Sequence, residues 1–265
     1  ISACSCTILS GNITVPSGKS MNLIDKLTVS GGSITFENNA NLIQTNSVAN
    51  SGVITVKRNS ALQVRLDHTL WSSPVEDVNL FGFSPLTLTN RFYTYATATN
   101  SYTNTGLSAS STFIPGKGFA VRAPNTFPTV PQTWEGVFTG IPNNGNIPFT
   151  LETSGTGYNL VGNPYPSPID AASFISGNPN IGGSLYFYAH TLTMGTNGLF
   201  PTGTNYAVWN ASGSTAATSG TSGVPSFLPN GTIKVGQGFI VKATSSGTVN
   251  VNNGMRINNT QNQFF

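Results

Sequence analysis

The sequence contains very few charged residues. Asp, Glu, Lys and Arg make up 7% of its 265 residues, whereas roughly 25% is usual for a soluble domain. The formal net charge of +3 comes from scattered positions, and nucleic-acid binding needs basic residues clustered in one patch. The sequence therefore predicts no nucleic-acid partner, and its polar surface must be built from Ser, Thr, Asn, Gln and Gly.

Cysteine and long apolar runs are also scarce. Cys4 and Cys6 are the two cysteines, and on a strand they would point the same way. A bridge across one intervening residue is badly strained, and zinc would need further ligands that are absent. We interpret both as small strand residues, with a disulfide or metal pair as the alternative. Because no apolar run is long enough to cross a bilayer, we expect no membrane span.

What the sequence does contain is one unit that occurs twice, and internal repetition decides the architecture before any single motif does. The offset between matching positions grows along the chain, so the second copy carries insertions. The matched runs are Leu70–Pro74 with Leu160–Pro164, Tyr93–Ala96 with Tyr186–Ala189, and Gly116–Ala123 with Gly236–Ala243.

Apolar and polar residues alternate within both copies, which predicts antiparallel, half-buried strands. We expect an all-β fold in which a duplicated, jelly-roll-like antiparallel β-sandwich comprises residues 53–146 and 147–265, with an inserted loop at 191–228. The Gly-x-Gly pairs at 116–118 and 236–238 are interpreted as bulges or close-packing points. Asp170 is placed to cap a short helix, the one helix that the pattern predicts.

Residues 1–52 follow a different pattern, in which strands of three to five residues are separated by Gly, Asn and Pro turns. Strands this short cannot bury a face alone, but successive coils that stack as a β-solenoid can. We predict a β-solenoid-like segment here, and a plain antiparallel meander is the alternative.

Acidic residues are too scattered for the common hydrolytic sites, which need two facing carboxylates or an acid beside a His. Asp67 and His68 are adjacent, so on a strand they point to opposite faces, and the matching Gly157 and Tyr158 keep neither group. We interpret Asp67 as a turn residue or a surface ion-pair partner. The chain is predicted not to be an enzyme, with no catalytic residue, no cofactor and no metal site.

Two aromatic residues differ from the others because they lie in the insertion and not on a repeated strand. Tyr206 and Trp209 are three residues apart and are flanked by Asn205 and Asn210. Aromatic faces beside amides suit sugar rings, which present both C–H faces and hydroxyls. These four residues form the candidate binding site, for a glycan or a partner protein.

The repeated motifs resemble modules in large surface proteins of Bacteroidetes that the type IX secretion system exports. The resemblance extends from about residue 53 to residue 265, and the preceding part is similar to the β-helical lead-in of such proteins. It implies export and display at the cell surface, in an adhesive or structural role. The residues that carry it are Leu70–Val75, Arg91–Tyr95, Tyr158–Asp170, Gly236–Phe239 and Asn253–Arg256.

These observations lead to one hypothesis and one alternative. The hypothesis is a non-enzymatic, extracellular structural or adhesive module of a bacterial cell-surface protein. It is able to assemble into fibres, and its partners are neighbouring copies or domains of the same protein. The alternative is a carbohydrate-binding module of a secreted protein.

Overall fold

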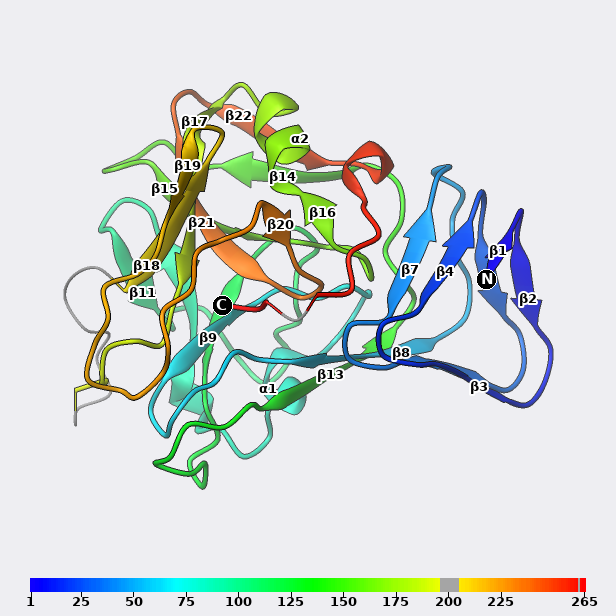
Figure 1. Cartoon of the computed structure of the whole chain (residues 1–265), viewed down its shortest axis with the longest axis horizontal. Helices are drawn as coiled ribbons and strands as arrows, with labels where there is room; N and C mark the ends of the chain where they lie inside the picture. Colours follow the sequence, from blue (N-terminus) through cyan, green and yellow to red (C-terminus); the bar gives the residue numbers. More distant parts are fainter. Residues whose placement is uncertain (196–204, 262) are drawn as a thin grey trace.

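The computed structural model of the chain describes residues 1–195, 205–261 and 263–265. Within these residues the fold is all-β, as the sequence predicts (Figure 1). The helical elements are α1 (Leu80–Phe83), α2 (Ala171–Ser176), η1 (Thr89–Arg91) and η2 (Asn253–Met255).

The N-terminal strands wind as a β-solenoid, which lies to one side of the molecule (blue in Figure 1). Successive coils pair in parallel, with Cys6 opposite Leu27 and Ile13 opposite Ile34. The antiparallel meander is therefore wrong for this segment. The strands are β1 (Ser2–Ala3), β2 (Cys6–Ile8), β3 (Asn12–Val15), β4 (Ser20–Leu23), β5 (Leu27–Val29), β6 (Ser33–Phe36), β7 (Asn41–Gln44) and β8 (Ile54–Asn59).

The solenoid and the first copy share one hydrophobic core. Phe36 and Val56 of the coils belong to the same buried cluster as Trp71 and Phe138 of the first copy. Strand β8 serves both parts, because it pairs in parallel with β6 and antiparallel with β13 (Glu135–Gly140). The buried cluster therefore extends across residue 52.

The two copies have the same strand order and the same register. In the first, Leu70 lies opposite Ala120, and in the second, Leu160 lies opposite Ile240. The first sheet has the order β11-β10-β12-β9 and the second the order β19-β18-β17-β21-β15. Their strands are β9 (His68–Trp71), β10 (Phe92–Ala96), β11 (Ser101–Thr103), β12 (Phe119–Arg122), β15 (Tyr158–Gly162), β17 (Ile181–Tyr188), β18 (Tyr206–Asn210), β19 (Gly213–Thr215) and β21 (Gly238–Ala243).

Each copy also contains a second, antiparallel strand pair. In the first copy this pair is β8 with β13, and in the second it is β14 (Ile147–Leu151) with β22 (Gly247–Val251). Strands β16 (Ile169–Asp170) and β20 (Thr232–Ile233) form a further short pair in the second copy, and the first copy has an isolated bridge between Asn79 and Thr112. Asp170 Oδ1 accepts a hydrogen bond of 2.7 Å from Ser173 N and caps α2, which confirms the predicted cap.

The central strands are buried on both faces, so the expectation of half-buried sheets is wrong here. Trp71 faces the core of the first copy, whereas its neighbour Leu70 packs with Leu160 and Ile240 in a third cluster between the two sheets. Successive side chains of each central strand therefore point alternately into two different hydrophobic cores. The inserted segment 191–228 also differs from the expected loop, because β18 and β19 extend the second sheet.

The sheets meet through reciprocal backbone contacts that follow the sequence repeat. Gly162 N donates to Gly116 O at 2.9 Å, and the matching Ser72 N donates to Gly236 O at 2.8 Å. A Cβ atom at Gly118 would lie 2.7 Å from Val161 O, too close for any side chain. The two copies therefore pack with approximate two-fold symmetry, and the Gly-x-Gly pairs are close-packing points.

The proline-rich run of the second copy holds the solenoid against the repeats. Leu42 N of β7 donates to Pro166 O at 2.7 Å, and Arg256 Nη2 donates to Leu42 O at 2.6 Å. The Arg256 guanidinium also donates to Ser167 Oγ, and it lies 4.6 Å from the centre of the Tyr165 ring. A buried cation is satisfied here by neutral acceptors and an aromatic face.

Candidate functional site

The described part of the chain contains no group of three or more His, Cys, Asp or Glu residues that could hold a metal ion. Asp67 is a turn residue, as predicted, because its Oδ2 accepts a 2.8 Å hydrogen bond from Val64 N. It is 1% exposed, so the surface ion pair is wrong. Burial raises the pKa of Asp67 to about 7, but the carboxyl lines none of the cavities described below.

The four residues of the predicted binding site do not converge. Tyr206 and Trp209 occupy strand β18 at positions of opposite parity, so they lie on opposite faces. Tyr206 packs between the two sheets, whereas Trp209 packs against the core of the second copy. Asn205 is buried and donates to Tyr188 Oη, and Asn210 accepts from Ser212 N in a turn.

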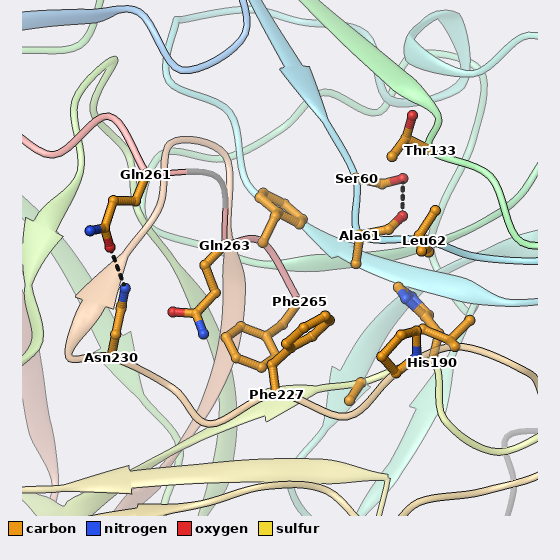
Figure 2. Close-up of a pocket in the computed structure, with 14 residues that line it drawn as sticks. Ser60, Ala61, Leu62, Thr133, His190, Phe227, Asn230, Gln261, Gln263 and Phe265 are labelled. Atoms are coloured by element: carbon orange, nitrogen blue, oxygen red, sulfur yellow. Dashed lines mark hydrogen bonds between the residues drawn. The ribbon is translucent and has the colours of Figure 1, made fainter. Parts of the chain in front are cut away.

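One cavity, of about 370 Å³, lies near the C-terminal residues (Figure 2). Gln261 and Gln263 line it together with His190 and the half-exposed ring of Phe227. Asn230 Nδ2 donates to Gln261 Oε1 at 3.3 Å. Burial lowers the pKa of His190 to about 4, so its ring is neutral at physiological pH. The described residues that line this cavity include no Asp or Glu.

A second cavity, of about 340 Å³, lies between the two copies and is lined mainly by tyrosines. Tyr95 and Asn100 belong to the first copy, and Tyr158, Tyr186 and Tyr206 belong to the second. The Tyr residues at 93, 95, 186 and 188 recur with period two in the sequence, which places them on one face of each strand. The sequence therefore indicates a tyrosine-bearing face in each copy, but it does not indicate that these two faces meet in the fold.

A third feature is the outer edge of the first coil. Strands β1, β2 and β3 are each at the end of their sheet and pair on one side only. Ile13 is 36% exposed, whereas Ile34, in the same position one coil further on, is 1% exposed. Leu9, 74% exposed, lies at the same end. Core-facing positions of the solenoid are thus left partly uncovered here.

The chain matches a protein family described as a domain of unknown function (DUF8693) over residues 2–265. It belongs to this family. No curated protein and no solved structure matches the chain. Neither α1 nor α2, the α-helices of the described residues, has the length and apolarity that a membrane span requires. Membership of DUF8693 assigns no activity, so a functional proposal must rest on the geometry of the coil edge and the cavities.

Proposed function

We propose that the chain is a non-enzymatic structural module of an extracellular bacterial surface protein, and that the open edge of its first coil joins it to a second copy. Export and surface display form part of this proposal, and they are supported by the motif resemblance at Leu70–Val75 and Tyr158–Asp170. Within the described part of residues 1–265, the observation that carries the structural role is that β1, β2 and β3 pair on one side only and leave Ile13 partly exposed.

The edge lacks the features that normally prevent strand pairing. Proteins protect free edges with charged residues, proline or a covering loop. Lys19 is the one charged residue among residues 1–19, and Pro16 is the one proline. The partly exposed side chains of Ile13 and Leu9 add apolar area that a neighbouring coil would bury.

The opposite end of the solenoid is closed. β8 continues into the antiparallel pairing with β13, and β7 is held by Pro166 and Arg256. A contact between two like edges is symmetric and closes after two subunits. Coil stacking therefore favours a dimer, and fibres would need a second contact surface.

Sedimentation velocity across a wide concentration range tests the proposal. We expect the wild-type chain to shift from monomer to dimer as concentration rises. Ile13→Lys should remain monomeric, because a charge at the coil edge opposes pairing. Leu86→Lys is the matched control, since Leu86 is 64% exposed and lies in the first copy, where its carbonyl accepts from Asn125 N, and it should dimerise like the wild type. A wild-type chain that stays monomeric, or an Ile13→Lys variant that still dimerises, would contradict the proposal.

A further inference from the structure

The tyrosine-lined cavity between the copies has the dimensions and chemistry of a ligand site. Its volume of about 340 Å³ is at the lower end of the ~300–1,000 Å³ found for ligand pockets. It exists only because the two copies pack together, since Tyr95 comes from β10 and Tyr158 and Tyr186 come from β15 and β17. Ile240 and Val208 supply the apolar part of the lining.

Hydrogen bonds hold the polar groups of this cavity in fixed orientations. Tyr95 Oη donates to Asn100 Oδ1 at 2.6 Å, and Thr156 Oγ1 donates to the same oxygen at 2.9 Å. The hydroxyls of Tyr206 and Tyr102 are 2.7 Å apart. Within the described residues, the Asn100 side chain uses only its oxygen in these bonds. Its Nδ2 donors are therefore available to a polar ligand.

The cavity is electrically neutral. All its lining residues are Tyr, Asn, Val or Ile. Burial raises the pKa of Tyr95 and Tyr186 above the ordinary value, so these phenols stay protonated near neutral pH. Aromatic rings also attract cations, but the lining holds no carboxylate, and Lys242 Nζ already lies 5.7 Å from the centre of the Tyr158 ring. A cationic ligand would be repelled by this ammonium group.

We propose that this cavity binds a neutral sugar unit of a glycan. Ring faces of Tyr158 and Tyr186, which lie edge to face at 5.7 Å, can pack against the C–H surface of a pyranose. The hydroxyl of Tyr95 and the amide of Asn100 can hydrogen-bond to its hydroxyl groups. The site goes beyond the structural role proposed above, and it differs from the sequence-based site in that Trp209 takes no part.

Isothermal titration calorimetry against a panel of neutral oligosaccharides tests the proposal. The panel is cellohexaose, maltohexaose, laminarihexaose, xylohexaose, mannohexaose and chitohexaose, with choline as a cationic probe. We expect at least one oligosaccharide to bind and Tyr186→Ala to weaken it roughly tenfold or more. Tyr186→Phe, which keeps the ring, should bind more tightly than Tyr186→Ala. Phe227→Ala, in the other cavity, should bind like the wild type.

Three results would overturn the sugar site. The first is no binding to any oligosaccharide, the second is oligosaccharide binding that Tyr186→Ala leaves unchanged, and the third is binding of choline alone. Circular dichroism and thermal melting of each variant show whether the fold is retained, and Tyr186→Phe covers the case in which Tyr186→Ala does not fold. Sedimentation of the same samples measures dimerisation through the coil edge independently of sugar binding. Failure of the sugar-site proposal can therefore be distinguished from failure of the structural proposal.

Discussion

Replacing Asp67 with Asn should change how stability depends on pH. Asp67 is buried in the turn directly before β9, where Oδ2 accepts from Val64 N and no described residue bonds to Oδ1. Burial is the main cause that raises its pKa from 3.8 to about 7, and the bond from Val64 N opposes the shift. The folded chain therefore holds this proton more tightly than the unfolded chain does.

The sign and the size of the effect follow from this difference. Because folding raises the pKa of Asp67, the protonated carboxyl stabilises the folded chain. This contribution is fully present below pH ~4 and is lost as pH rises through about 7. The pKa of Asp67 rises by about three on folding, and each whole number of pKa corresponds to ~1.4 kcal/mol. Ionisation of Asp67 should therefore lower the free energy of unfolding by an amount on the order of 4 kcal/mol. The Asp67→Asn variant keeps an oxygen that can accept from Val64 N, but it cannot ionise.

Urea denaturation followed by tryptophan fluorescence measures this directly, because Trp71 is buried in the adjacent core. The free energy of unfolding of Asp67→Asn minus that of the wild type should rise by about 4 kcal/mol between pH 4 and pH 8. Other titrating groups are common to both proteins and cancel in the difference. Parallel pH profiles for the two proteins would refute the claim that the carboxyl is buried without charge compensation.

Two further predictions concern the contacts that join the parts of the molecule. Gly118→Ala and Gly238→Ala should each lower the free energy of unfolding by about 1–3 kcal/mol, because the added Cβ would lie 2.7 Å from Val161 O or 3.0 Å from the Leu70 backbone. Gly183→Ala is the control, since no atom lies within 4 Å of its Cβ position, and its free energy of unfolding should stay within about 0.5 kcal/mol of the wild-type value. Equal effects at all three glycines would argue against the two-fold packing. Arg256→Gln should cost about 3 kcal/mol in urea denaturation, and full stability in this variant would show that the guanidinium does not hold the coils.

The sequence predicts those features of the fold that depend on local pattern and repetition. Period-two alternation defines strands whatever they pack against, and the Leu70 and Leu160 positions repeat because each faces the other copy. Short strands separated by Gly and Asn turns predict the coils for a similar reason. Each turn allows the direction change that stacking requires, as the positive φ angles of Gly11 and Gly32 illustrate.

Features that depend on packing between distant segments could not be predicted. The spacing of Tyr206 and Trp209 suggested one site while the segment was expected to be a loop, but β18 places the two rings on opposite faces. The tyrosine cavity depends on Tyr95 meeting Tyr186 across the joint between the copies. Asp67 was expected at the surface because an acid usually is, and only the packing of the turn against neighbouring strands buries it.

Thiol cross-linking tests the structural proposal most directly, because both cysteines lie on the first coil. Cys4 is exposed, and Cys6 is half-buried on β2, and both are free thiols in the structure. With a short-arm bismaleimide, which bridges two thiols irreversibly, we predict covalent dimers from the Cys6→Ser variant, whose exposed Cys4 has no second thiol in its own chain to react with, and none from the Cys4→Ser, Cys6→Ser double variant. Dimers that sediment normally but resist cross-linking, or the absence of any dimer, would contradict association through the open coil edge.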